Sequence, residues 1–395
     1  MTTTTEASRL LAEAGGVLII MNSLSQGGGD RVAVLVANGL ARAGIPTRIA
    51  MMRESGQPEV RALLHPDVSI ACAGPPMGLK LSSGRQPLGH RHLERVRGIR
   101  LVRREIDAFK PAVVLGASDN MAFITALARR PQDEGTVFGF KLTNRLSRPN
   151  IGPGRRVYRY RLFKFIFDRL DLVLTLADAE RDYVLTIHPG REDLLRTVPN
   201  PYVTDDMLVD VSPRPAGPPQ LLAAGRMVPQ KRFDNLLRAF ALTSTPGARL
   251  TILGDGPLRP SLEALAKSLG IADRVDMPGY VGDIIPRLRK SDLFVLSSDY
   301  EGLPAVILES LACNVPVATT ESFFAARELL GDVGSCAVVP IGNPEALAGA
   351  IDRCLASKDR TDLKAIAQPY RIEPAIDAHI AVLAEAVGQR RALVA

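Results

Sequence analysis

Residues 291–320 read SDLFVLSSDYEGLPAVILESLACNVPVATT, and this stretch decides the fold of the C-terminal half of the chain. A wholly apolar run, Leu293–Leu296, ends in a polar loop, and a helical stretch begins near Pro304. Proline suits the first turn of a helix, where its missing N–H would have no partner. A second apolar run, Val315–Thr319, then follows. Short apolar runs buried on both faces are typical of parallel strands in an α/β sheet.

The same alternation of strand and helix extends outward from this stretch in both directions. Predicted strands fall at Val17–Met21, Thr47–Met51, Val113–Leu115, Val137–Phe140, Leu172–Leu176, Gln220–Ala224, Arg249–Leu253, near Val275 and near Ala337–Val339. Predicted helices include Phe233–Leu242, Pro260–Leu269, Pro304–Ala312, Glu345–Leu355 and Pro374–Leu393. Strands that alternate with helices predict doubly wound α/β domains with parallel sheets.

A chain of 395 residues exceeds one ordinary core, so two domains are expected. We predict an N-terminal Rossmann-like domain over residues 1–200 and a second one over residues 220–370. Residues 201–219 are rich in Pro, Asp, Ser and Gly and are interpreted as a linker. Residues 371–395 form a final helix, for which packing back on the N-terminal domain is an option. Two such domains would face each other across a ligand-binding cleft.

The composition excludes several classes of protein. No run approaches the roughly 20 apolar residues that span a bilayer, and residues 1–16 lack the basic and apolar regions of a signal peptide. Four scattered cysteines, Cys72, Cys313, Cys336 and Cys354, indicate reduced thiols rather than a disulfide framework or a zinc site. We therefore expect a cytoplasmic protein, with peripheral attachment to the inner face of a membrane as an option.

The positive charge of the chain is concentrated in residues 141–170. This segment contains nine Lys or Arg residues and one acidic residue, so its net charge is +8. The net charge of the whole chain is +7, which means that the rest of the chain sums to −1. Within it, RRVYRYRLFKFIFDRL interleaves cations with aromatic residues, notably Arg155, Arg156, Arg159 and Lys164. This segment is either a core helix with one solvated face or a contact for anionic lipid headgroups. Nothing accompanies the charge that is typical of nucleic-acid binding.

Two glutamates in residues 291–320 suggest a binding site. Glu301 lies in the loop at the carboxyl end of a strand, and Glu309 lies eight residues later on the following helix. The free N–H groups at the start of that helix, over Leu303–Val306, favour phosphate oxygens. Glu309 can accept hydrogen bonds from both ribose hydroxyls, and Glu301 can hold hydroxyls of a sugar beside the phosphates.

The motifs of the C-terminal half resemble those of the retaining glycosyltransferases of family four, which have the GT-B fold. Residues 291–320 resemble the E-x7-E signature with its E-G-L-P loop. AAGRMVPQKRFDNLLRAF at residues 223–240 resembles the G-R-x-x-x-Q-K segment, and LTILGDGPLRPSLEALAKSLG at residues 250–270 resembles the G-x-G segment. MPGYV at residues 277–281 is similar to the stretch that meets the base, and NSLSQGGGDR at residues 22–31 to the glycine loop. The resemblance covers most of residues 220–339 and the N-terminal half only in patches.

This resemblance implies a role for each matching residue. Arg226 and Lys231 would clamp the donor diphosphate, as cations at a strand-to-helix turn can. Gly28 and Gly29 would let the backbone approach the β-phosphate. Glu309 would bind the ribose and Glu301 the transferred sugar. Further donor contacts would come from Gly302, Leu303, Pro304, Tyr280 and Val281.

The resemblance also implies the reaction. A hexose or N-acetylhexosamine would pass from a UDP- or GDP-sugar to a lipid-linked or nascent glycan, with retention of the anomeric configuration. The leaving diphosphate gains negative charge, which Arg226 and Lys231 would stabilise. The chain contains no D-x-D triplet, so we predict no metal and no other cofactor.

One position departs from the family pattern. Many members carry a histidine near the end of a strand in the middle of the N-terminal domain, but residues 116–120 here read GASDN. Asp119 could take over that contact with the donor sugar, or it could be the N-cap of the helix that follows. The departure puts the identity of the sugar in doubt.

The glycine-rich motifs also allow other interpretations. The glycines at residues 27–29 could form only a turn, and neither this segment nor residues 254–259 has the third glycine of a dinucleotide fingerprint, which argues against a dehydrogenase. The main alternative function is a non-catalytic nucleotide-sugar-binding partner in a surface-polysaccharide assembly. A related sugar phosphorylase or epimerase is the third option.

Overall fold

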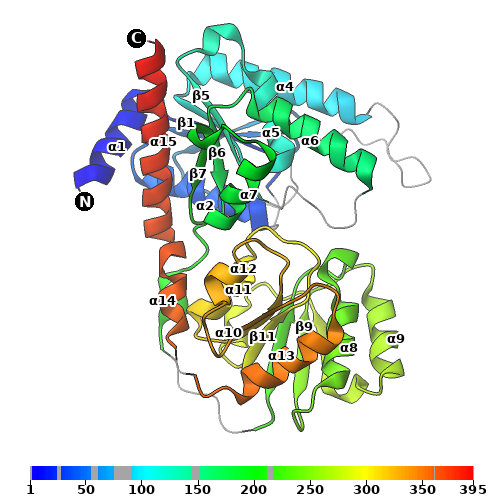
Figure 1. Cartoon of the computed structure of the whole chain (residues 1–395). Coiled ribbons are helices and arrows are strands. Elements are labelled where there is room, and N and C mark those ends of the chain that lie inside the picture. The colour runs from blue at the N-terminus through cyan, green and yellow to red at the C-terminus, as the bar shows by residue number, and fades with distance from the viewer. Residues whose placement is uncertain are drawn as a thin grey trace. The chain divides into compact units, whose positions relative to one another are not determined.

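The computed structural model describes residues 2–24, 28–54, 61–74, 90–143, 152–210, 217–359 and 361–394. It divides the chain into two compact units (Figure 1). The first contains Met1–Thr143, Ile151–Pro201 and Ile372–Ala395, and the second contains Tyr202–Arg371. The second unit thus begins inside residues 201–219, and the last helix of the chain belongs to the first unit. Among the described residues no helix is both long and apolar enough to span a bilayer.

The first unit is built on a parallel sheet of seven strands in the order β3-β2-β1-β4-β5-β6-β7. The strands are β1 (Val17–Met21), β2 (Thr47–Met51), β3 (Val68–Cys72), β4 (Val113–Gly116), β5 (Val137–Lys141), β6 (Leu172–Thr175) and β7 (Leu195–Thr197). The central strands β1, β4 and β5 are buried over their whole length, as their apolar sequences predict. The edge strands β3 and β7 were not predicted, because polar residues interrupt both apolar runs.

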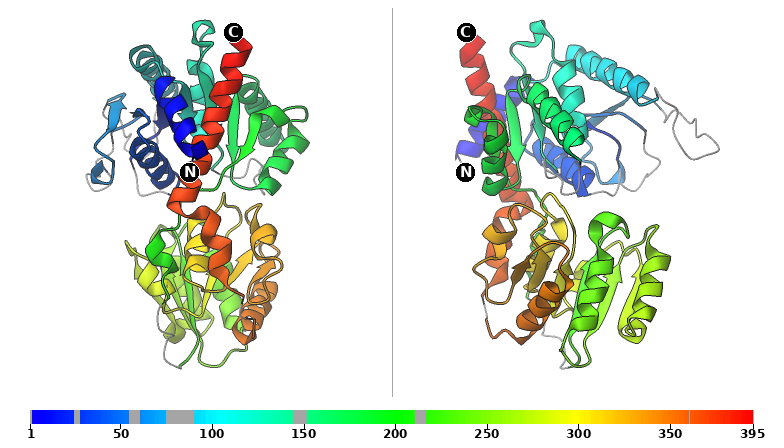
Figure 2. Two further views of the ribbon diagram at one scale, coloured as in Figure 1. Left: turned by 90° about the vertical axis from the view of Figure 1, so that its left-hand side faces the viewer. Right: turned by 45° about the vertical axis from the view of Figure 1, so that its right-hand side comes forward.

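Helices cover both faces of this sheet (Figure 2). The described helices are α1 (Thr2–Glu13), α2 (Gly28–Arg42), α4 (His90–Phe109), α5 (Asp119–Ala128), α6 (Pro153–Phe167), α7 (Asp178–Ile187) and α15 (Ile372–Val394). Helix α15 packs against α1 and α2 on one face, and α5 contacts α4 and α6 on the other. An added Cβ at Gly39 of α2 would lie 2.5 Å from Ile376 of α15, so the absence of a side chain permits this close packing.

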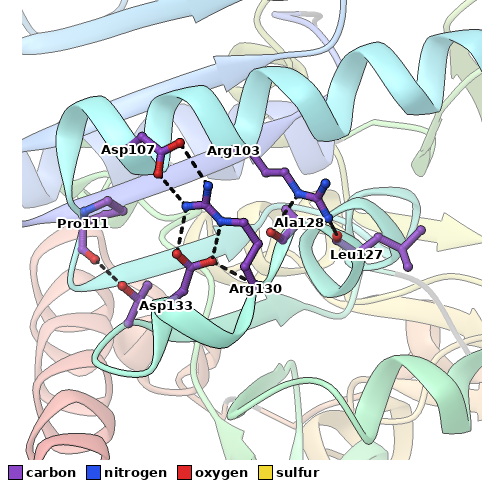
Figure 3. Close-up of polar contacts among 8 residues, drawn as sticks. Arg103, Asp107, Pro111, Leu127, Ala128, Arg130 and Asp133 are labelled. Carbon is purple, nitrogen blue, oxygen red and sulfur yellow. Dashed lines mark hydrogen bonds and ion pairs between the residues drawn. The ribbon is translucent and has the colours of Figure 1, made fainter.

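Arg130 connects α4 to the segment that follows α5 (Figure 3). Its guanidinium binds both carboxylate oxygens of Asp107 at 2.6 and 3.0 Å and also pairs with Asp133 at 2.9 Å. Through this hydrogen bond Arg130 holds the pKa of Asp107 below its ordinary value. Arg103 donates to the carbonyl of Leu127 at 3.0 Å, at the end of α5. These contacts fix α4 against the C-terminal end of α5.

The second unit is built on a parallel sheet of six strands in the order β10-β9-β8-β11-β12-β13. The strands are β8 (Gln220–Ala224), β9 (Arg249–Leu253), β10 (Val275–Gly279), β11 (Leu293–Leu296), β12 (Val317–Thr320) and β13 (Ala337–Val339). Its helices are α8 (Phe233–Leu242), α9 (Arg259–Ser268), α10 (Ile285–Leu288), α11 (Ala305–Ala312), α12 (Ala326–Leu330), α13 (Pro344–Ala356) and α14 (Leu363–Ala367). The prediction of two Rossmann-like α/β domains is confirmed.

All four cysteines are free thiols, as the sequence predicts. Burial raises the pKa of Cys354 to about 12 and that of Cys313 to about 11. Thiols with such high pKa values carry almost no thiolate at neutral pH and are therefore unreactive.

A buried basic pair holds α15 to the sheet of the first unit. Lys141 Nζ lies 2.7 Å from His379 Nε2, and His379 Nδ1 lies 2.7 Å from the carbonyl oxygen of Ala375. Burial lowers the pKa of Lys141 to about 7, against the opposing charge of Glu180. Burial, together with the charge of Lys141, lowers the pKa of His379 well below its ordinary value. His379 is therefore neutral in the folded protein.

We expect the melting temperature to fall as the pH is lowered from about 7 to about 5. Above the ordinary histidine pKa of about 6.5, His379 is neutral in the folded and unfolded chain alike. Below it the unfolded chain binds a proton that the folded chain does not, which favours unfolding. Lys141 extends the rise of stability above about pH 7, because only the unfolded chain keeps that lysine fully charged. Thermal melts across this range should show a shallower pH dependence for His379→Gln; an unchanged slope would contradict the assignment.

Candidate functional site

The candidate site of the second unit lies where the strand order of its sheet reverses. Strands β8 and β11 are neighbours in the middle of the sheet. From β8 the chain continues outward to β9 and β10, and from β11 it continues in the opposite direction to β12 and β13. The loops after β8 and β11 therefore diverge at the carboxyl edge, and ligands of open α/β sheets bind at such a switch point.

The loop after β11 carries Glu301 and is fixed by the neighbouring strand β12. The N–H of Glu301 donates to the carbonyl of Ser322 at 2.8 Å, and the Thr320 hydroxyl donates to the carbonyl of Ser298 at 2.7 Å. Glu301 is only 8% exposed. A carboxylate held this firmly and mostly out of water interacts strongly with any charge beside it.

The loop after β8 carries Lys231 at the end of a short 3₁₀ turn, η4 (Pro229–Lys231), which is bound to the Glu301 loop. The Gln230 side-chain amide donates to the carbonyl of Tyr300 at 2.7 Å, and the Asp299 N–H donates to the carbonyl of Gln230 at 2.9 Å. The Ser297 hydroxyl donates to the carbonyl of Lys231 at 2.8 Å. The two loops therefore form one structural assembly across the switch point.

The side chains of Lys231 and Glu301 meet in this assembly. Lys231 Nζ lies 2.6 Å from Glu301 Oε1, and the lysine side chain is 20% exposed. An added Cβ at Gly225 would lie 3.1 Å from Lys231 Cε and 3.3 Å from its Cδ, so the lysine stem runs along the backbone of Gly225. The structure thus brings two predicted site residues together that stand 70 positions apart in the sequence.

Arg226 also lies in the loop after β8, with an exposed side chain. Its guanidinium has no hydrogen-bonding or ionic partner among the residues that the structure describes. The turn beneath it needs glycines: an added Cβ at Gly254 would lie 2.0 Å from the carbonyl oxygen of Gly225, and one at Gly256 would lie 2.6 Å from that of Met227. Both glycines have positive φ angles, +129° and +159°. The G-x-G segment at residues 254–256 therefore packs directly against the backbone of the turn that carries Arg226.

Glu309 lies in α11, which begins at Ala305 with Pro304 as its N-cap. Its side chain is 3% exposed, so it is an interior residue and not the surface glutamate that a helix position would suggest. The first N–H groups of α11 have no acceptor within the helix, as at every helix start. Gly302, Leu303 and Pro304 lead from Glu301 into this turn.

Tyr280 and Val281 follow Gly279, the last residue of the edge strand β10. The carbonyl of Gly279 accepts a hydrogen bond of 2.8 Å from the N–H of Gly254, which ties this end of β10 to the loop after β9. Tyr280 is 65% exposed, and Val281 is half-buried. An exposed aromatic ring at the carboxyl edge of a sheet is available for stacking on a base.

The first unit has its own switch point between β1 and β4. Helix α2 begins at Gly28, with Gly29 in its first turn, while Gly27 lies outside the described residues. An added Cβ at Gly29 would meet only Thr143, at 3.8 Å, which is ordinary contact. Among the residues that the structure describes, none therefore requires a glycine at position 29.

Asp119 lies at the other side of this switch point, in the first turn of α5. The N-cap of α5 is Ser118, so the interpretation of Asp119 as N-cap is wrong. Its carboxylate instead accepts a hydrogen bond of 3.1 Å from the N–H of Thr143, the residue that also lies beside Gly29. Asp119 thus links the loop after β5 to the start of α5.

The basic segment of residues 155–170 forms most of α6 and the turn after it. Its C-terminal half enters the core through Phe163, Ile166 and Phe167. Its N-terminal half is largely exposed, including Tyr158 at 65%. Among the four cations predicted to face lipid, Arg155, Arg156 and Lys164 are exposed and Arg159 is half-buried. The interpretation as a core helix therefore fits the C-terminal half, and the N-terminal half is exposed to solvent.

Two family models match the chain in sequence. The model of glycosyltransferase family 4 matches residues 26–206, and the model of glycosyl transferases group 1 matches residues 206–369. The chain belongs to the family 4, group 1 glycosyltransferases. This membership confirms the resemblance on which the site assignment was based.

Curated glycosyltransferases resemble part of this family 4 member. It is 36% identical over 176 residues to the lipopolysaccharide core biosynthesis glycosyltransferase LpsE of Rhizobium meliloti, a match that covers 43% of this chain and 51% of LpsE. It is 34% identical over 127 residues to the N-acetylgalactosamine-N,N'-diacetylbacillosaminyl-diphospho-undecaprenol 4-alpha-N-acetylgalactosaminyltransferase of Campylobacter jejuni, covering 32% of this chain and 34% of that protein. The chain thus spans about a half and about a third of the length of these two relatives, respectively.

Solved structures of other proteins share its fold. The lipopolysaccharide outer core galactosyltransferase WaaB matches with a TM-score of 0.70 and 17% identity, covering 93% of this chain and 99% of WaaB. The Anabaena protein Alr3699/HepE, solved in complex with UDP-glucose, matches with a TM-score of 0.67 and 17% identity, covering 96% and 98% of the two chains. At such identities the likeness shows the fold alone, which is the GT-B architecture of two parallel α/β units.

The residues that connect the two loops of the candidate site were not predicted from the sequence. Gln230 and Asp299 join the loop after β8 to the loop after β11, and Arg232 pairs with Asp299 at 3.1 Å. Gln230 and Arg232 flank the predicted Lys231, and Asp299 lies two residues before Glu301. Their proximity in sequence to predicted site residues was the available signal.

Proposed function

We propose that this chain transfers a sugar from a nucleoside-diphosphate donor to a glycan or lipid-linked acceptor, with retention of configuration and without a metal. The observation that carries the proposal is the Lys231–Glu301 pair, which lies at the switch point of the second sheet on loops tied to each other. A cation and a carboxylate side by side suit a ligand that combines a diphosphate with a sugar rich in hydroxyls.

The donor would be held by the edge of the second sheet. Arg226 and Lys231 would bind the diphosphate together with the N–H groups that begin α11. Glu309 would accept hydrogen bonds from the ribose hydroxyls, and Glu301 from the sugar. The base would lie against Tyr280 and Val281. In the first unit, the family resemblance implies that Gly28 and Gly29 approach the β-phosphate, and we propose that Asp119 takes the sugar contact that a histidine makes in many family members.

The same groups would lower the barrier to transfer. As the bond between the anomeric carbon and the phosphate oxygen breaks, negative charge grows on the leaving diphosphate. Lys231 and Arg226 attract that charge more strongly in the transition state than in the bound donor, which is the condition for catalysis. The Ser297 hydroxyl holds the backbone of Lys231 in place, so only the lysine side chain has to turn toward the phosphates when the donor binds.

The proposed acceptor follows from the curated relatives. LpsE is named for the lipopolysaccharide core, and the Campylobacter jejuni relative for an undecaprenol-linked saccharide. Both are consistent with an acceptor that is a growing glycan, carried on a lipid in at least one of them. We extend this acceptor class to the present chain and leave the sugar open between hexose and N-acetylhexosamine.

Release of the nucleoside diphosphate from a panel of UDP- and GDP-sugars tests this function. We expect one nucleotide series to be cleaved slowly in the absence of acceptor, at the same rate with and without EDTA. The positive charge at the diphosphate would come from side chains and a helix N-terminus, which EDTA does not remove. Binding of a nucleotide-sugar without any cleavage or transfer would favour the non-catalytic alternative, and a rate abolished by EDTA and restored by a divalent ion would refute metal independence.

A second proposal concerns α6, which we assign to an anionic membrane surface on the cytoplasmic side. Arg155 and Arg156 are exposed in its first turns, beside Val157 and Tyr158, which are 54% and 65% exposed. An exposed helix end with cations next to apolar and aromatic side chains is the pattern of an interfacial helix. This contact would bring the chain to a lipid-linked acceptor.

Co-sedimentation with vesicles that contain anionic lipid tests the contact. The triple variant R155Q/R156Q/R159Q should bind such vesicles roughly a hundredfold more weakly, because each cation near an anionic surface contributes about 1 kcal/mol. The matched control R238Q/K267Q/R287Q removes three cations of the second unit and should bind like the unaltered protein. Equal losses in both variants would show only a general effect of net charge and would refute the assignment to α6.

A further inference from the structure

The Lys231–Glu301 pair has a consequence for the product that the proposed function does not include. Lys231 carries three N–H donors, and Glu301 is the partner of its ammonium group among the residues that the structure describes. At 2.6 Å the two groups are in direct contact as a charge-assisted hydrogen bond. In the free protein, the positive charge of Lys231, which is proposed to bind the diphosphate, is therefore already neutralised by the Glu301 carboxylate.

The intact donor and the nucleoside-diphosphate product offer different groups to the Glu301 carboxylate. A sugar offers hydroxyl donors to Glu301, so the carboxylate keeps hydrogen bonds while Lys231 turns toward the phosphates. A bare diphosphate offers no donors. Glu301, which is 8% exposed, must then either retain Lys231 or remain a poorly solvated anion beside the phosphates. Both possibilities weaken the binding of the product.

We infer that Glu301 weakens the binding of the nucleoside diphosphate. The Lys231–Glu301 ion pair forms again after sugar transfer and thereby promotes release of the product. This inference rests on the proposed function, because it takes the Lys231 side of the site to bind the diphosphate. It assigns Glu301 a role toward the product in addition to its contact with the sugar. The geometry that allows it is the direct contact of the two side chains, on loops joined through Gln230 and Asp299.

Titration calorimetry with UDP and GDP tests the inference. Removing a carboxylate from a proposed binding site would ordinarily be expected to impair binding. Here E301Q should bind the nucleoside diphosphate about threefold to tenfold more tightly than the unaltered protein. The same variant should bind the nucleotide-sugar no more tightly. An affinity for the nucleoside diphosphate that is unchanged or lower in E301Q would overturn the inference.

A double-mutant cycle shows whether the effect passes through Lys231. In the K231M background, the change E301Q should give clearly less tightening, because no cation is left to be released. D299N serves as the control for a general loss of negative charge, since Asp299 lies in the same loop but pairs with Arg232. Equal tightening in D299N, or full tightening in the K231M background, would show simple repulsion and refute the role of the pair.

Two further variants, E301A and E309A, show whether a negative result concerns the inference alone or the proposed site as a whole. The backbone of Glu301 is held by Ser322 irrespective of the side chain, so E301A provides a second variant should E301Q fail to fold. E309A should weaken the binding of the nucleoside diphosphate if the proposed site is correct. If E309A weakens that binding and E301Q leaves it unchanged, the inference fails alone. If neither variant alters it, the proposed site fails as well.

Discussion

Replacement of Lys231 with alanine should lower the turnover number about a hundredfold or more, a loss like that on removing one group that stabilises developing charge. The change removes the cation that faces the leaving diphosphate. It also leaves Glu301, 8% exposed, without its ionic partner, which opposes the negative charge that develops during transfer. The Michaelis constant for the donor should rise less than the turnover number falls, because Arg226 still binds the ground-state diphosphate.

Steady-state kinetics with the cleaved nucleotide-sugar would measure both constants. Lys267→Ala is the matched control, because this lysine is exposed on α9 and lies outside the proposed site. Its kinetic constants should equal those of the unaltered protein. Unchanged turnover in the Lys231 variant would remove Lys231 from the mechanism.

Replacement of Glu309 with alanine should weaken nucleotide binding about a hundredfold, because two hydrogen bonds from the ribose to a charged acceptor are lost. The side chain is 3% exposed, so its carboxylate is well shielded from water, where such bonds contribute most. The conservative Glu309→Gln variant keeps one acceptor oxygen and should lose about tenfold. Titration of the nucleoside diphosphate would give both values.

Glu263→Ala provides the control for this experiment, since Glu263 is a solvent-accessible glutamate of α9 that pairs with Arg259 at 2.9 Å. Its affinity for the nucleotide should not change. Thermal melts of every variant would show that the fold is intact before binding is compared. A Glu309→Ala protein that is folded and binds the nucleotide normally would contradict the ribose assignment.

Much of the fold could be predicted because its strands are continuous apolar runs. The boundaries of β1, β2, β8 and β9 agree with those expected from sequence, since these strands are central or nearly so. Strand β3, with Ser69, and the three-residue β7 escaped prediction because edge strands need no continuous apolar run. An apolar run in the sequence therefore indicates a buried segment, and it predicts a strand only where that strand is buried.

The positions of single residues of the candidate site could be predicted from the sequence, but the contacts between them could not. Glu301 and Glu309 could be placed on a loop and a helix from local sequence, but the contact of Glu301 with Lys231 could not. That contact depends on the pairing of β8 with β11, which is a property of the whole sheet. The N-cap alternative for Asp119 was wrong for a local reason: Ser118 and Asp119 are both good N-cap residues, and the helix begins after the first of them.

The central claim is that the carboxyl edge around β8 and β11 binds a nucleotide-sugar donor without a metal. Thermal stabilisation by a panel of UDP- and GDP-sugars, measured with and without EDTA, tests it most directly, because a ligand that binds only the folded protein raises its melting temperature. We predict a clear shift for one nucleotide series, unaffected by EDTA and lost in the Glu309→Ala variant. No shift with any member of the panel would contradict the assignment of Glu301, Glu309, Arg226 and Lys231 to a donor site.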